Sequence, residues 1–168
     1  MKRRTFIKNA SLSAGLLTVS PILHAAANTA PASFELLDLH VHTTDTFTIE
    51  NILEIGRKNK VKFGIVDHPA VWALKDDKDL KNYIEKLRKY PVYIGLQPTY
   101  LGWSKNYSAE LIAQLDYILM DPQMVPKGNG ETWQIWEFDT YIDDTKDFMK
   151  RYMDYAMEVL TKEPINIF

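Results

Sequence analysis

Three of the four histidines in this 168-residue chain fall in one short stretch, at the ends of two apolar runs. His40 and His42 form an H-x-H pair, and His68 follows Asp67. Imidazole is the commonest protein ligand for zinc, manganese and iron. The chain contains no cysteine, so thiolate ligands are excluded and a metal would be held by nitrogen and oxygen. The pattern predicts a metal centre. The alternative is three histidines that are neighbours in sequence only.

Short apolar runs alternate with amphipathic ones along residues 34–168. The short runs predict strands and the amphipathic ones predict helices. Strands are expected over 34–41, 61–66, 91–96, 117–120 and 165–168. Helices are expected over 49–59, 77–89, 108–115 and about 143–161, with a polar and aromatic loop over 121–141. This α/β series predicts a parallel sheet with helices outside it, which right-handed crossovers can curl into a barrel.

The histidines would lie where such folds place their chemistry, at the carboxyl ends of the strands. His40 and His42 end the first strand, and Asp67 and His68 end the second. Side chains alternate along a strand, so the first strand should have one polar and one apolar face. The polar face would carry Asp38, His40 and His42, and the apolar face Leu37, Leu39 and Val41. We expect the polar face to line the interior of the barrel.

The first 27 residues have the features of a cleavable export signal. A basic head precedes an apolar middle over 14–23 and the small residues 25–27, which suit a cleavage site. The run Arg3-Arg4-Thr5-Phe6-Ile7-Lys8 is similar to the twin-arginine signal, although an ordinary secretory signal is the alternative. We therefore expect a signal peptide over 1–27, a tether over 28–33, and a domain over 34–168 that the twin-arginine machinery exports to the periplasm. The apolar run is too short to span a membrane, and without cysteine no lipid anchor is expected.

The charge of the predicted mature chain limits its partners. Four of the 20 basic residues and none of the 22 acidic ones precede residue 28, so 16 basic and 22 acidic residues remain, a net charge of −6. The sequence shows no patch of lysine and arginine, and phosphate backbones would be repelled. We expect a small-molecule substrate and no nucleic-acid partner. A small anionic substrate is compatible with this charge, because a bound cation inverts the local field.

The segment from Asp38 to Thr43, followed by Asp67 and His68, resembles the start of a PHP domain, the polymerase and histidinol phosphatase family. The resemblance extends over about residues 36–119. It implies a distorted (β/α)7 barrel that binds up to three divalent metal ions and hydrolyses phosphoesters with metal-activated water. Amidohydrolases also begin with H-x-H, and the D-H after the next strand is what favours the PHP family.

The resemblance assigns roles to individual residues. His40, His42 and His68 match metal ligands of the family. Asp38 and Asp67 would orient ligands without binding the metal. Asp45 is either a further ligand or a residue that stabilises its turn.

Two positions depart from the family's pattern. Gln97 stands where the family normally has a glutamate that bridges metals, and Asp121 stands near the place of a family histidine. Both are weaker candidate ligands, and a neutral glutamine is a poor bridge between cations. The set therefore implies one or two zinc, manganese or iron ions.

The last residues, 165–168, lie in an apolar run that predicts a strand without a covering helix. We interpret the sequence as the N-terminal part of a distorted TIM-like (β/α)7 barrel, with about five parallel strands and truncated at its C-terminus. The alternative is an open five-stranded sheet.

Aromatic residues follow several predicted strands. Trp72, Tyr100 and Trp103 are candidates for a substrate wall, and packing of the loops onto the barrel rim is the alternative. The leading hypothesis is a PHP-type phosphoesterase. The alternatives are an amidohydrolase-like enzyme that cleaves C–N or C–O bonds, and a degenerate PHP domain that binds a ligand or metal without turnover.

Overall fold

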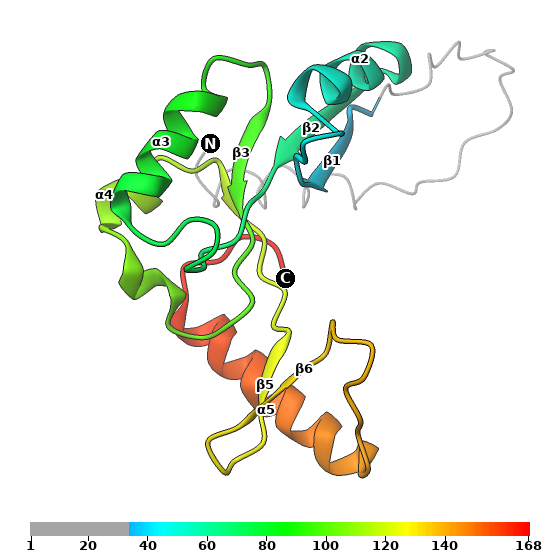
Figure 1. The fold of residues 1–168 in the computed structure, drawn as a ribbon, viewed down its shortest axis with the longest axis vertical. Coiled ribbons are helices and arrows are strands. Elements are labelled where there is room, and N and C mark those ends of the chain that lie inside the picture. Colours follow the sequence, from blue (N-terminus) through cyan, green and yellow to red (C-terminus); the bar gives the residue numbers. More distant parts are fainter. Residues whose placement is uncertain (1–33) are drawn as a thin grey trace, which may run out of the picture. The chain divides into compact units, whose positions relative to one another are not determined.

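Four parallel strands form the main sheet of residues 34–168, the part of the chain that the structure, a computed structural model, describes. They are β1 (Leu36–Val41), β2 (Val61–Ile65), β3 (Tyr93–Leu96) and β4 (Tyr117–Ile118), hydrogen-bonded in that order (Figure 1). Each neighbouring pair is parallel. The signal peptide and tether expected over 1–33 lie outside the described residues.

Helices connect these strands as the sequence predicts. α2 (Ile49–Asn59) joins β1 to β2, α3 (Asp77–Leu87) joins β2 to β3, and the 3₁₀ helix η2 (Trp103–Asn106) and α4 (Ala109–Ile112) precede β4. Side chains of Thr48 and Asp76 accept hydrogen bonds from the first turns of α2 and α3, which satisfies amide groups that have no partner inside the helix. The parallel α/β class is confirmed. No helix of residues 34–168 is long and apolar enough to cross a membrane.

The sheet is curled, and Tyr117 shows how strongly. Its hydroxyl, on β4, donates a hydrogen bond to the main-chain oxygen of Leu39 on β1 at 2.7 Å. In a flat sheet these two strands would lie about 14 Å apart, three strand spacings, and a tyrosine side chain reaches only about half that distance. The ring crosses β3 and β2 at Gly95 and Gly64, where a Cβ atom would overlap it. Such a sheet is compatible with part of a TIM-like barrel.

A bulge in β1 corrects the predicted alternation of its side chains. Asp38 pairs with Phe63 and Val41 pairs with Ile65, so β1 carries one more residue than β2 between these pairs. The extra residue reverses the alternation, and Leu39 lies on the same face as Gly64 and the Tyr117 ring. The prediction that Leu39 faces away from the interior was wrong. Register depends on the neighbouring strand, which one strand's sequence does not reveal.

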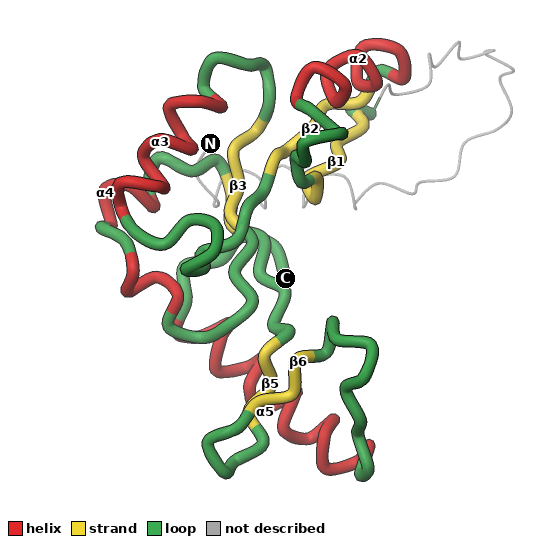
Figure 2. Tube along the Cα trace, in the orientation of Figure 1, coloured by secondary structure: helices red, strands yellow, loops and turns green. Residues whose placement is uncertain are grey.

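The segment predicted as a loop over 121–141 contains an antiparallel hairpin, made of β5 (Met124–Pro126) and β6 (Thr132–Gln134). Its turn uses two glycines with positive φ, Gly128 at 87° and Gly130 at 89°, a conformation that favours glycine. Val125 is fully buried, and α5 (Thr145–Lys162) packs against β5. Figure 2 shows this hairpin as two short strands between long loops.

The fifth strand expected over 165–168 is reduced to a single bridge. Ile167 pairs with Leu119 in parallel orientation, and Met120 donates its main-chain N–H to the oxygen of Ile167 at 2.8 Å. The segment therefore lies beside the chain that continues β4, which is the position of a next strand in the sheet.

Replacing Gly95 by alanine should destabilise the fold, because the added methyl group overlaps the Tyr117 ring. We expect Gly95→Ala to lower the free energy of unfolding by about 1–3 kcal/mol, measured by urea denaturation. The double variant Gly95→Ala/Tyr117→Leu relieves the overlap, so its loss should be smaller than the sum of the two single losses. Strict additivity would show that the ring does not occupy this place.

Candidate metal centre

The carboxyl ends of β1 and β2 bring the three histidines together. The ring centroids of His40 and His42 are 5.6 Å apart, and those of His42 and His68 are 4.9 Å apart. His40 lies within the bulge of β1, His42 directly follows that strand, and His68 lies in the loop after β2. The structure thus places side by side the imidazoles that the sequence singled out.

Gln97 joins two of these histidines to the sheet. It follows β3 directly and is 3% exposed. Its side-chain oxygen accepts a hydrogen bond from Nε2 of His42 at 2.7 Å, and its main-chain oxygen accepts one from Nδ1 of His68 at 3.0 Å. Its own main-chain N–H donates to the oxygen of Asp67 at 2.9 Å. Gln97 therefore holds both rings, His42 through its side chain and His68 through its main chain.

These bonds determine which ring nitrogens are free to bind a metal. A neutral imidazole that donates from one nitrogen keeps a lone pair on the other. His68 donates from Nδ1, so its Nε2 is the available ligand atom, an arrangement common for metal-binding histidines. His42 donates from Nε2, which leaves its Nδ1. The two rings stack with their planes 20° apart, so their lone pairs do not converge on one point without a rotation of one ring.

The pKa of His42 is lowered below its ordinary value of 6.5. The main cause is burial, which disfavours the imidazolium form, and the neighbouring His68 and His40 add to it. The hydrogen bond to Gln97 and the charge of Asp67 act in the opposite direction. The neutral form of imidazole is the one that can bind a metal, so burial favours the form in which His42 could act as a ligand.

Asp38 and Asp67 orient the main chain of the histidines. Oδ1 of Asp38 accepts a hydrogen bond from the main-chain N–H of His40 at 3.2 Å, within the bulge. Oδ1 of Asp67 accepts one from the main-chain N–H of His68 at 2.8 Å. Each aspartate is thus hydrogen-bonded to the main chain of a histidine and not to its imidazole ring.

The structure does not bring the weaker carboxylate candidates into the same cavity. Asp45 is exposed in the turn before α2, and Asp121 pairs with the side-chain amide of Gln123. Within residues 34–168 no three side chains of histidine, cysteine, aspartate or glutamate form a group arranged to hold a metal ion. The donors are of the right kind, but the imidazoles lack the shared carboxylate that would complete a preformed site.

A cavity of about 700 Å³ opens over the histidines. Trp72, Tyr100 and Trp136 contribute its aromatic lining, and the Trp72 ring centroid lies 5.2 Å from that of His68. Trp103 does not reach it, because this side chain is fully buried in the hydrophobic core. Two of the three residues expected to form a substrate wall therefore line the cavity.

The β5–β6 hairpin supplies lining residues that the sequence did not single out. They are neutral or acidic side chains from the segment that the sequence predicts as a loop: Gln123, Met124, Gln134 and Glu137. The available signal was the glycine-containing turn at 128–130 between Val125 and Trp133, which is typical of a hairpin.

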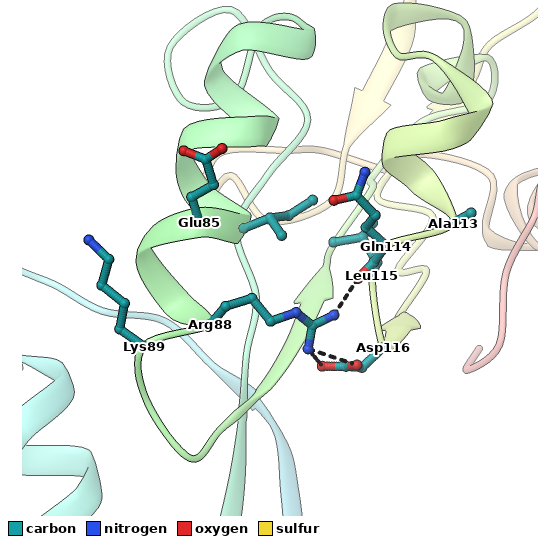
Figure 3. A pocket seen from close by; sticks show the side chains of 8 residues that line it. Glu85, Arg88, Lys89, Ala113, Gln114, Leu115 and Asp116 are labelled. Atoms are coloured by element: carbon teal, nitrogen blue, oxygen red, sulfur yellow. Dashed lines mark hydrogen bonds and ion pairs between the residues drawn. The ribbon is translucent and has the colours of Figure 1, made fainter.

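A second cavity, between α3 and α4, has a structural explanation. Figure 3 shows its paired charges: both Oδ atoms of Asp116 accept hydrogen bonds from Arg88, at 3.1 and 2.9 Å. Oδ2 of Asp116 also accepts a hydrogen bond from the main-chain N–H of Ile94 at 2.8 Å, so the pair fixes the start of β3 against β4.

Comparisons of the chain with family models, with curated proteins and with solved structures found no match.

The lowered pKa of His42 predicts a loss of stability in acid. Without metal, the unfolded chain binds a proton at this residue near pH 6.5, whereas the folded protein binds it only at lower pH. The contribution of His42 to the free energy of unfolding is therefore fully present above pH 6.5. It is lost as the pH falls through the pKa that His42 has in the folded protein. NMR titration with a chelator present should show His42 titrating below 6.5.

The isosteric variant Gln97→Glu should raise the pKa of His42, because a carboxylate beside Nε2 favours the charged ring. An unchanged titration would contradict the contact between His42 and the side chain of Gln97.

Proposed function

We propose that this protein is a divalent-metal-dependent hydrolase of the PHP type, with a phosphoester as substrate. The observation that carries the proposal is that three imidazoles lie beside one another at the carboxyl ends of two parallel strands, and all three line a cavity of about 700 Å³. We also propose that the curled sheet is the N-terminal part of a distorted (β/α)7 barrel. The twin-arginine pattern at residues 3–8 supports export to the periplasm.

His68 and His42 would hold the metal, with His40 as a third ligand. The main-chain oxygen of Gln97 would keep the His68 ring in the tautomer whose Nε2 is free. Rotation of His42 away from the Gln97 side chain would release its Nε2 as a ligand atom. A bound divalent cation supplies a water molecule activated for attack and neutralises negative charge on the phosphoester. The overall reaction consumes one water, breaks one P–O bond and yields an alcohol and a phosphate.

Gln97 also favours a second candidate function, a domain of this type that binds its ligand without turnover. The amide carries no charge, so it adds nothing to the attraction of a cation that a carboxylate at the same place would supply. The same glutamine accepts hydrogen bonds from the rings of both His42 and His68, so these ring nitrogens already have partners within the protein. The two candidates differ in whether hydrolysis accompanies metal binding.

Metal analysis and an activity assay test the proposal together. After reconstitution with Mn²⁺ or Zn²⁺, we expect the protein to retain one or two ions and to hydrolyse p-nitrophenyl phosphate or bis(p-nitrophenyl) phosphate. His42→Ala and His68→Ala should each lower kcat/KM by about a hundredfold or more, because each removes a ligand. Asp45→Asn is the matched control, since this exposed aspartate lies outside the cavity and should leave metal content and rate unchanged.

The outcomes separate the candidates. Retained metal that is lost in His68→Ala, without hydrolysis of either ester, would support the binding domain. Absence of metal in the reconstituted wild-type protein would refute both forms of the proposal.

Replacing Gln97 by glutamate is a second test of the metal centre. The variant Gln97→Glu keeps the length of the side chain and adds a negative charge beside His42. We expect tighter retention of Mn²⁺, by about tenfold, the factor that corresponds to 1.4 kcal/mol, measured by competition with a chelator. Weaker retention would show that the glutamine amide does not stand at the cation.

A further inference from the structure

The cavity over the histidines combines exposed aromatic rings with neutral polar groups. Trp72 is 72% exposed and Trp136 is 43% exposed, although large apolar side chains are normally buried. They come from different segments, one after β2 and the other after β6. Rings left open to a cavity offer faces for stacking, so this lining is suited to hold a flat or ring-shaped ligand.

Each ring makes one contact that restricts its orientation. Nε1 of Trp136 donates a hydrogen bond to the side chain of the adjacent Glu137 at 3.1 Å. The Trp72 ring lies against His68, with their planes 55° apart. Rings with restricted orientation lose little entropy when a ligand binds, which favours their use as binding surfaces.

The charge of the lining excludes a second anionic group on the ligand. Among the described residues that line the cavity there is no lysine or arginine, and Glu137 contributes a negative charge. Protein sites for phosphate, sulfate or carboxylate groups normally use arginine or lysine. A phosphoryl group at the metal centre would be neutralised by the cation, whereas another anion elsewhere in the cavity would meet hydroxyl and amide groups, aromatic rings and a carboxylate, and no lysine or arginine. The rest of the ligand is therefore uncharged or cationic.

The polar groups of the lining distinguish between the remaining ligands. Thr99, Gln123 and Gln134 offer hydroxyl and amide groups that both donate and accept hydrogen bonds. A quaternary ammonium group would use the aromatic rings but would form no hydrogen bond with Thr99 or Gln134. A nucleobase would use them along one edge only. A pyranose carries hydroxyls around its whole perimeter and presents C–H groups to the negative face of an indole ring.

We propose that this cavity binds a neutral sugar, stacked on Trp72 or Trp136 and hydrogen-bonded to Gln123, Gln134 and Glu137. The inference rests on the proposed function for one point, that the sugar carries the phosphoester that is cleaved. The substrate class is then a monophosphorylated sugar, and the released alcohol is a sugar hydroxyl. Binding of the sugar itself uses none of the three histidines.

Binding of unphosphorylated sugars tests the inference without any catalysis. The probes are maltose, cellobiose, lactose and N,N′-diacetylchitobiose, with adenosine and choline as competitors of other chemistry. Binding to the full chain in EDTA is followed by saturation-transfer NMR and by tryptophan fluorescence. We expect at least one disaccharide to bind with a Kd of about 1 mM or below, and more tightly than adenosine or choline.

Three tryptophan variants provide the comparison. Trp72→Leu or Trp136→Leu should weaken that binding by about tenfold or more, a change of 1.4 kcal/mol. Trp133→Leu is the matched control, because Trp133 packs edge-on against Phe148, with centroids 5.3 Å apart, and does not line the cavity. Thermal unfolding of each variant identifies any that has lost its fold.

The outcomes distinguish this inference from the proposed function. Sugar binding in EDTA without metal-dependent hydrolysis would leave the inference standing and remove the enzyme. Hydrolysis of p-nitrophenyl phosphate without binding of any of the four sugars would overturn the inference alone. Tighter binding of adenosine or choline, or equal losses in all three tryptophan variants, would also overturn it.

Discussion

The hydrogen bond from Tyr117 to Leu39 is the constraint on which the candidate site depends. It connects β4 to β1 across two intervening strands, and it forms only because Gly64 and Gly95 have no side chain in the path of the ring. Without this curvature the end of β1 would lie about 10 Å from β3, two strand spacings away. With it, His42 at the end of β1 reaches Gln97 at the end of β3. The curvature that the two glycines allow therefore determines which side chains meet at the histidines.

Gln97 shows how burial and charge oppose each other in this site. Burial of His42 lowers its pKa and keeps the ring in the neutral, metal-binding form. The neutral amide beside it satisfies the buried ring nitrogen without introducing a buried charge, which would be costly. Because the amide of Gln97 carries no charge, it would attract a cation less strongly than a carboxylate at the same place. In the proposed metal centre, this composition would lower the affinity for metal and favour the stability of the protein without metal.

Periodicity in the sequence predicted the parts of the fold whose apolar pattern is long. The predicted helices over 49–59 and 77–89 correspond to α2 and α3, and the order of the four strands follows from their alternation with helices. The bulge in β1 could not be predicted, because it is defined by pairing with β2. The β5–β6 hairpin was missed because each strand has three residues, too few for a period. Trp103 shows a further limit: a tryptophan after a strand can enter the core as readily as it can line a cavity.

The histidines and the polar lining of the cavity come from different parts of the fold. The histidines and Gln97 lie at strand ends, whose positions are fixed by main-chain hydrogen bonds within the sheet, so a small displacement of one donor is resisted by the whole ladder. Much of the polar lining lies in or beside the hairpin, which α5 supports through the fully buried Val125 and Val159. A hairpin can change sequence without disturbing the sheet, because its strands pair with each other and not with β1–β4. In the proposed enzyme, reactivity would therefore depend on the sheet, whereas selectivity for the ligand would depend on a separately supported segment that can vary while the imidazoles stay in place.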